Sequence, residues 1–153
     1  MRRLRLILMP FALLYGAIVF VRNWLFDKGY LKSTSYDFPV ICVGNLSVGG
    51  TGKSPMIEYL IRLLKDKYKV ATLSRGYKRK TTGFLLADET TTASDIGDEP
   101  LQFYSKFKNE IQVAVEAERT KGIEALQNLE NSPEVILLDD AFQHRKVSAG
   151  LQI

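Results

Sequence analysis

Short apolar runs alternate with amphipathic segments along most of the chain. Runs rich in β-branched residues predict buried strands at residues 40–45, 70–74, 111–115 and 134–140. Apolar residues at helical spacing predict helices at residues 54–69, 98–107 and 118–130, the last weakened by Gly122. This alternation is typical of an α/β fold with a mainly parallel sheet flanked by helices. In such sheets ligands bind beyond the carboxyl ends of the strands.

Two polar segments interrupt the pattern. Residues 75–98 contain a basic loop, a short strand predicted at 84–87 and a second loop rich in threonine and acids. Residues 32–39 are polar and contain turn formers, which predicts a linker. We therefore expect two parts, an N-terminal hydrophobic helix with a basic and aromatic segment (residues 1–35) and one α/β domain (residues 36–153).

The N-terminal part contains an uninterrupted apolar run, Leu6–Val21. Its sixteen residues would reach about 24 Å as a helix, which is shorter than the hydrocarbon core of roughly 30 Å. The aromatic residues that follow, Trp24, Phe26 and Tyr30, suit the headgroup level. We expect a helix embedded in one leaflet; the alternatives are an uncleaved signal anchor, a cleaved signal peptide and a helix buried in protein.

Charge and composition narrow the class of protein. Residues 1–35 contain six basic residues and one acidic residue, a net charge of +5, whereas the whole chain of 153 residues carries +4. Because the excess brackets the apolar run, it indicates an anionic membrane surface and not a nucleic-acid partner. Hydrophobic residues at 46% exclude a disordered tail, and one cysteine and one histidine exclude a disulfide framework and disfavour a zinc site.

The stretch "VGNLSVGGTGKSP", residues 43–55, is similar to the phosphate loop pattern G-x-x-x-x-G-K-[ST], with Ser47 in place of the first glycine. A strand precedes it and a helix follows it, as a phosphate site at a helix N-terminus requires. Lys53 would reach the β- and γ-phosphates of ATP, and Ser54 would offer its hydroxyl to Mg²⁺. The alternative is a structural glycine turn. The predicted nucleotide-binding residues are Ser47, Val48, Gly49, Gly50, Thr51, Gly52, Lys53 and Ser54.

A second acidic motif supports this hypothesis. In "VILLDD" four apolar residues lead to Asp139 and Asp140, and an acid at the tip of a buried strand holds Mg²⁺ in nucleotide-hydrolysing folds of this kind. One of the two would face the metal, and the other the acceptor or a residue beside the metal; Asp139 is predicted as the ligand, with Asp140 left open as the alternative. A solvated strand end is the non-functional alternative. Asp98, in "GDEP", is predicted as the N-cap of its helix, a role that can coexist with a catalytic one.

Four motifs, "VGNLSVGGTGKSP", "LSRGYKRK", "GDEP" and "LLDDAFQHR", occur in the order found in the tetraacyldisaccharide 4′-kinase family, the lipid A 4′-kinases of Gram-negative bacteria. The resemblance covers nearly the whole chain and includes the N-terminal helix. It implies Mg²⁺-dependent transfer of the ATP γ-phosphate to the 4′-hydroxyl of a lipid A disaccharide precursor, a glycolipid. It also implies a location at the cytoplasmic face of the inner membrane.

The resemblance also implies roles for single residues. Lys53, Asp139 and Asp140 match the family's phosphate-binding and acidic residues, and Asp98 matches the catalytic base. Arg119 lies where the family has an active-site arginine, although the flanking residues differ. Predicted substrate contacts are Arg75, Tyr77 and Gln143. The basic residues of "SRGYKRK" would bind an anionic headgroup or the phosphate that the substrate already carries, or form a solvated loop.

Length is the main departure from the family, whose members are roughly twice as long as this chain. We expect the chain to be a fragment, and the absent half to supply a second lobe and a histidine paired with the catalytic aspartate. His144 belongs to "FQH" and is not that histidine. The alternative functions are another membrane-associated P-loop NTPase, or an inactive fragment that binds nucleotide without catalysis.

Overall fold

The structure is a computed structural model that describes residues 2–44, 52–140 and 145–153. The chain divides into two compact units, Met1–Ser33 and Thr34–Ile153. The predicted nucleotide-binding residues 47–51 and the predicted substrate contact Gln143 lie outside the described residues.

The first unit is dominated by one helix, α1, Arg2–Asp27. It contains the predicted apolar run and extends beyond it at both ends. From Leu14 onward most of its large apolar side chains are exposed, among them Phe20 and Trp24. Trp24 stacks on Tyr30 with ring centroids 5.9 Å apart. Within residues 2–44, 52–140 and 145–153, no helix combines the length and the apolar character needed to cross a bilayer.

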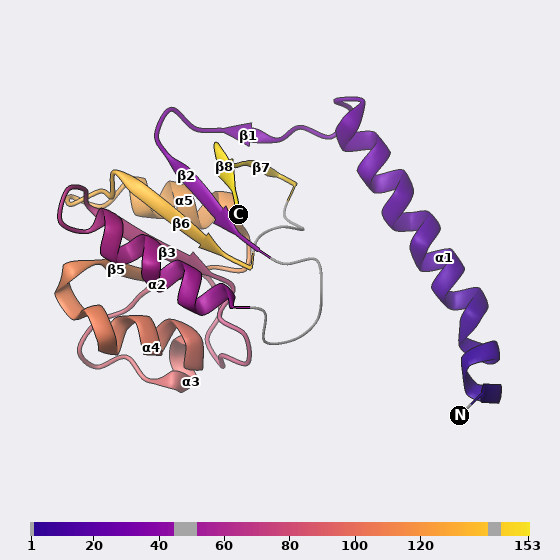
Figure 1. Cartoon of the computed structure of the whole chain (residues 1–153), viewed down its shortest axis with the longest axis horizontal. Coiled ribbons are helices and arrows are strands. Elements are labelled where there is room, and N and C mark those ends of the chain that lie inside the picture. Colours follow the sequence, from indigo (N-terminus) through magenta and orange to yellow (C-terminus); the bar gives the residue numbers. More distant parts are fainter. Residues whose placement is uncertain (1, 45–51, 141–144) are drawn as a thin grey trace. The chain divides into compact units, whose positions relative to one another are not determined.

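The second unit contains a six-stranded sheet with the order β4-β5-β3-β6-β2-β8 (Figure 1). Every neighbouring pair is parallel except β4 with β5, so the predicted mainly parallel α/β fold is confirmed. The strands are β2 (Val40–Val43), β3 (Val70–Ser74), β4 (Leu85–Leu86), β5 (Gln112–Val115), β6 (Val135–Asp139) and β8 (Leu151–Gln152). Two further short strands, β1 (Thr34–Ser35) and β7 (Val147–Ser148), pair with each other.

Helices cover both faces of the sheet. Helices α2 (Lys53–Leu64) and α4 (Asp98–Phe107) share one apolar cluster with the sheet, and α5 (Arg119–Gln127) shares another. Along β6, Val135 and Leu137 belong to the cluster of α2 and α4, whereas Ile136 and Leu138 belong to that of α5. By the two-residue period of a strand, the side chain of Asp139 continues the α2 and α4 side.

The order of the strands creates a binding edge. From β2 the chain passes through α2 to β3, which lies beyond β6; from β6 it continues to β8, which lies beyond β2. The connections that leave β2 and β6 therefore run in opposite directions across the sheet. Ligands bind at the carboxyl ends of strands at such a topological switch point. Val43 is paired with Asp139 at this end, so both predicted motifs meet there.

Several local predictions were wrong. Helix α2 ends at Leu64 instead of residue 69. The side chains that it buries are Ile57, Leu60 and Ile61. Asp98 is not an N-cap: it is the first residue of α4, and Gly97, with φ 92°, is the cap. The short helix α3 (Ala93–Ile96), the 3₁₀ turn Lys108–Glu110 and strands β1 and β7 were not predicted.

Gly122 has a packing reason that the sequence did not reveal. A Cβ at this position would lie 2.8 Å from Cδ2 of Leu73 and 3.0 Å from Cβ of Glu116. Leu73 is fully buried, so its side chain has little room to move aside. The glycine therefore lets α5 lie close against β3, which brings Arg119, the first residue of α5, beneath the end of β6.

Candidate functional site

Helix α2 begins near the carboxyl ends of β2 and β6, with Gly52 as its N-cap. Its N-cap, Gly52, has φ 82°, a left-handed conformation that glycine adopts without a steric penalty. The cap contributes no side-chain hydrogen bond, and the first turn contains Lys53 and Ser54 but no acid. The first backbone N–H groups of a helix carry partial positive charge and bind anions.

Lys53 forms an ion pair with Asp140, whose Oδ1 lies 2.7 Å from the lysine Nζ. The turn after β6 produces this contact, because Asp140 has φ 49° and donates its backbone N–H to the carbonyl of Val43 at 3.0 Å. The hydrogen bond from Lys53 to Asp140 raises the pKa of Lys53, and the charges of Asp139 and Glu99 act in the same direction. The structure thus brings together the predicted phosphate-binding lysine and the predicted acid pair.

Glu99 is a residue of the site that the sequence did not identify. The hydroxyl of Ser54 donates a hydrogen bond to the Glu99 carboxylate. Glu99 is in the first turn of α4, where an acid is favoured by the helix dipole alone, so its identity and position carried no functional signal. Only the packing of α4 beside α2 shows that it reaches the predicted Mg²⁺ ligand.

Asp139 differs sharply from its neighbour Asp140. It is only 2% exposed, and among the described residues its Oδ1 has no hydrogen-bond partner. Burial raises the pKa of Asp139 to about 7, with further contributions from the negative charges of Glu99 and Asp140 that outweigh Lys53 and Arg119. The buried residue is therefore a carboxyl group whose charged form needs a cation.

Arg119 lies under the site rather than in the open. It is 2% exposed, and its guanidinium donates to the backbone carbonyls of Glu116 and of Asp139, the latter at 3.1 Å. Burial lowers its pKa to about 10, so it stays charged at neutral pH. In this position Arg119 holds the end of β6 in place, and direct contact with a ligand stays a prediction.

Asp98 is exposed and directly precedes Glu99 at the start of α4. Its role as a base stays a prediction. The basic loop packs against the backbone immediately ahead of it, because a Cβ on Gly97 would lie 2.8 Å from the carbonyl oxygen of Tyr77. Two motifs that are separate in the sequence are therefore in direct backbone contact.

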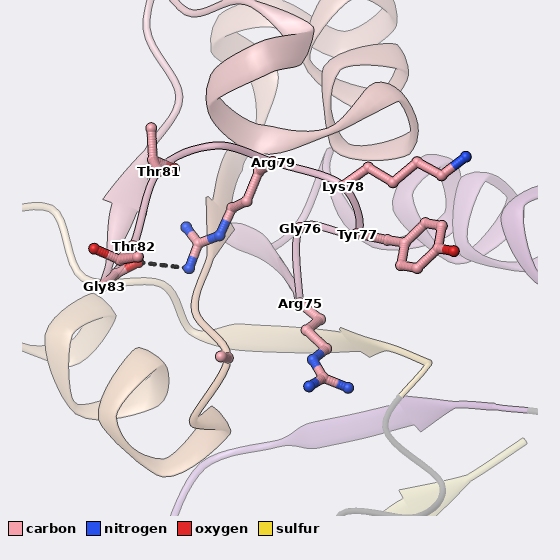
Figure 2. A pocket seen from close by; sticks show the side chains of 9 residues that line it. Arg75, Gly76, Tyr77, Lys78, Arg79, Thr81, Thr82 and Gly83 are labelled. Atoms are coloured by element: carbon pink, nitrogen blue, oxygen red, sulfur yellow. Dashed lines mark hydrogen bonds between the residues drawn. The ribbon is translucent and has the colours of Figure 1, made fainter.

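The same basic loop lines a cavity of about 410 Å³ that is open to solvent (Figure 2). Arg79 donates to the carbonyl of Gly83 at 2.8 Å and so closes the loop on itself. In Figure 2 the side chains of Arg75 and Arg79 lie on different sides of Gly76. The positive charge of Arg75 contributes to the lowered pKa of Arg119. The cavity is lined by Arg75, Gly76, Tyr77, Lys78, Arg79, Thr81, Thr82, Gly83 and Ala117, three of them cationic and none acidic.

The oxygens near the start of α2 fit a hard divalent cation. Ser54, Glu99 and Asp139 offer hydroxyl and carboxylate oxygens, which Mg²⁺ prefers. Among the described residues, no three His, Cys, Asp or Glu side chains form a metal-binding group on their own.

The chain is similar to a well-defined set of proteins. The family model LpxK, described as tetraacyldisaccharide-1-P 4′-kinase, matches residues 4–153. A tetraacyldisaccharide 4′-kinase of Flavobacterium johnsoniae is 67% identical over all 153 residues, which cover 45% of that protein. Its counterpart in Flavobacterium psychrophilum is 66% identical, with 44% of that protein covered. The chain thus spans less than half the length of these relatives.

A solved structure is similar over nearly the same range. The crystal structure of LpxK from Aquifex aeolicus in complex with ATP is 47% identical in sequence and superposes with a TM-score of 0.84. The match covers 97% of this chain and 48% of that one.

The raised pKa of Asp139 predicts a pH-dependent stability. The folded protein holds this proton up to about pH 7 and the unfolded chain only to about pH 4, so the stabilisation is present at low pH and lost as the pH rises between these values. Asp139→Asn should remove up to about 4 kcal/mol of that dependence. Urea unfolding at pH 4.5 and 7.5, without nucleotide or divalent cations, measures it. Asp37→Asn, in the exposed loop before β2, is the control; equal slopes for wild type and Asp139→Asn would contradict the assignment.

Proposed function

This chain belongs to the tetraacyldisaccharide-1-P 4′-kinase family, and from that premise we propose that it carries the nucleotide-binding part of a lipid kinase. The reaction is transfer of the ATP γ-phosphate to the 4′-hydroxyl of a tetraacyldisaccharide 1-phosphate precursor of lipid A. The observation that carries the proposal is the meeting of Lys53, Ser54, Asp139 and Asp140 at the switch point between β2 and β6. ATP bound with its phosphates at the start of α2, as in P-loop proteins, would contact all four of these residues.

Lys53 is the residue that changes partner in this proposal. In the structure its ammonium group is bound to the exposed Asp140, at a distance of 2.7 Å. Incoming β- and γ-phosphates carry more charge than one carboxylate, so they compete effectively for the same ammonium group. Asp140 therefore holds Lys53 in position before ATP arrives, and the first turn of α2 adds backbone N–H donors for the phosphates.

We assign the Mg²⁺ site to the hydroxyl of Ser54 and the carboxylate of Asp139, with Glu99 beside them. When bound, the ion would neutralise charge on the phosphates and on the buried Asp139. Glu99 accepts a hydrogen bond from the Ser54 hydroxyl, which leaves the oxygen lone pairs of Ser54 free to face a cation. The raised pKa of Asp139 supports this assignment, because a carboxyl that resists ionisation is stabilised by a bound cation.

Asp98 is the proposed base for the acceptor hydroxyl. It is exposed at the first residue of α4, adjacent to Glu99, so it is accessible to an acceptor outside the protein core. The phosphate that the acceptor already carries is assigned to the cavity lined by Arg75 and Tyr77. A guanidinium group can donate two parallel hydrogen bonds to a phosphate group. The residues that line the cavity include no acid, which favours binding of an anion.

The N-terminal unit is proposed to rest on the cytoplasmic face of the bacterial inner membrane. The large exposed apolar side chains of α1 from Leu14 onward need an apolar environment, and Trp24 and Tyr30 suit its interface. The basic residues around the apolar run favour anionic lipids. In this arrangement the kinase meets its glycolipid acceptor at the bilayer surface.

Lys53→Ala tests the nucleotide site. We expect it to weaken ATP binding by the 153-residue chain about 10- to 100-fold, the loss of one or two charge-assisted hydrogen bonds. Isothermal titration calorimetry with ATP and Mg²⁺ measures the affinity, with Lys67→Ala, exposed beyond the end of α2, as the control. Unchanged affinity of the Lys53 variant would rule the site out.

The same variants test transfer itself. The chain is extended with the remaining part of the Flavobacterium johnsoniae relative and incubated with γ-labelled ATP and the lipid A precursor. Loss of Lys53 should reduce turnover by about 10²–10³. Nucleotide binding without transfer by the extended protein would favour a non-catalytic nucleotide binder, and preference for GTP would favour another P-loop NTPase.

Arg75→Ala tests the cavity. A soluble sugar 1-phosphate, N-acetylglucosamine 1-phosphate, should perturb NMR signals of the basic loop, and the substitution should weaken its binding about tenfold or more. Lys80→Ala is a matched control, since Lys80 is a cation of the same loop that does not line the cavity. Uncharged N-acetylglucosamine should bind no more tightly to wild type than to Arg75→Ala. If Lys80→Ala weakens binding of the sugar phosphate as much as Arg75→Ala does, the effect comes from the net charge of the loop, and the cavity assignment is wrong.

Replacement of Arg2, Arg3 and Arg5 by glutamine tests the membrane assignment. Each basic residue near an anionic surface contributes about 1 kcal/mol, so flotation with phosphatidylglycerol-containing vesicles should weaken by roughly 100-fold. Neutralising three exposed lysines of the second unit, Lys67, Lys80 and Lys108, provides the control. Equal flotation by both triple variants would contradict a directed role for the N-terminal segment.

A further inference from the structure

Two neighbouring strands end in a buried polar side chain. Ser74, the last residue of β3, is 7% exposed, and Asp139, the last residue of β6, is 2% exposed. The strands are parallel with Leu73 paired to Leu138, so the next residue along each strand places Ser74 beside Asp139. Both stand at the carboxyl end of the sheet, where the nucleotide site was assigned.

The two side chains also face the same way. Val70 of β3 and Val135 of β6 belong to the cluster covered by α2 and α4, whereas Leu73 and Leu138 belong to that of α5. Counting in steps of two along each strand places Ser74 with Val70, and Asp139 with Val135. The hydroxyl and the carboxylate therefore lie next to each other beneath the start of α2.

Both groups lack a hydrogen-bond partner among the residues that the structure describes. Among the described residues, Oγ of Ser74 and Oδ1 of Asp139 are buried oxygens without a hydrogen-bond partner. Leaving such a group unsatisfied destabilises the folded protein, and the penalty is larger for a charged group. Buried water usually resolves such cases, provided that the site supplies at least two polar partners.

We propose that Ser74 is a positioning residue for Asp139, acting through one buried water molecule. The Ser74 hydroxyl donates to the water oxygen, and the water donates to Oδ1 of Asp139. The bridge fixes the plane of the carboxylate, so that its other oxygen is presented to the cation held with Ser54. This inference rests on the proposed function, because it takes Asp139 as a ligand of the nucleotide-bound cation.

The charged groups around Asp139 do not replace this bridge. Lys53 and Arg119 attract the carboxylate and Glu99 and Asp140 repel it, and these are interactions of charge at a distance. The guanidinium of Arg119 donates to the backbone carbonyl of Asp139 and to that of Glu116. None of these four charged residues donates a hydrogen bond to Oδ1 of Asp139, which has no donor among the described residues.

Cation binding tests the proposal without any need for turnover. Mn²⁺ serves as a paramagnetic substitute for Mg²⁺, and its affinity for the 153-residue chain saturated with ADP is measured by electron paramagnetic resonance. Ser74→Ala should weaken Mn²⁺ binding about 10- to 100-fold, the usual effect of removing a group that orients a metal ligand. Ser74→Thr, which keeps the hydroxyl, should restore most of the affinity.

Val113→Ala separates positioning from general loss of stability. Val113 is buried on the same face of β5, so this variant should lower the melting temperature and leave Mn²⁺ affinity unchanged. Mn²⁺ affinity of Ser74→Ala equal to wild type overturns the Ser74 inference alone, as does failure of a folded Ser74→Thr to restore binding. A wild-type chain that binds no Mn²⁺ beside ADP overturns the proposed cation site and this inference together.

Discussion

The backbone pairing of β2 with β6 is the constraint on which the site depends. It sets Val43 opposite Asp139, so the chain leaves β2 toward α2 at the level where β6 ends in its two acids. A shift of one residue in this register would turn Asp139 to the α5 side, away from Lys53 and Ser54. The hydrogen bond from the Asp140 amide to the Val43 carbonyl continues the pairing past the last strand residue. Backbone geometry therefore places the acids before any side chain contributes.

Electrostatics then divides the two aspartates. Asp139 is enclosed by the sheet and the helices, where its charged form is penalised, while Asp140 turns out at φ 49° and pairs with Lys53 near solvent. Burying a carboxylate is costly unless cations compensate it, and here Lys53 and Arg119 supply only part of the compensation. A site of this kind favours ligands that bring positive charge inward and negative charge to Lys53. A metal–nucleotide pair does both at once.

The strands and helices could be predicted because each combines a clear period with a clear boundary. β2, β3, β5 and β6 all lie within one or two residues of the predicted limits. The predicted roles of Lys53, Ser54, Asp139 and Asp140 came from motifs, and the structure brings those four together. Glu99 and Ser74 could not be found in this way, because their importance depends on which helix and which strand pack beside them. The same holds for Gly122, whose local effect is unfavourable and whose value lies in contact with Leu73.

Glycine also explains how distant motifs are joined at the site. Gly76 and Gly97 both have positive φ. A Cβ on Gly97 would collide with the carbonyl oxygen of Tyr77 at 2.8 Å, whereas a Cβ on Gly76 would lie 3.1 Å from the carbonyl oxygen of Ile96, a tight contact, and would collide with Arg79 of its own loop. The basic loop therefore rests directly on the turn that opens α4, where Asp98 and Glu99 begin. Glu99, in the first turn of α4, contacts Ser54 at the start of α2. The first turn of α4 therefore lies between the basic loop that lines the cavity and the start of α2. The start of α4 thus contacts both the basic loop and the start of α2.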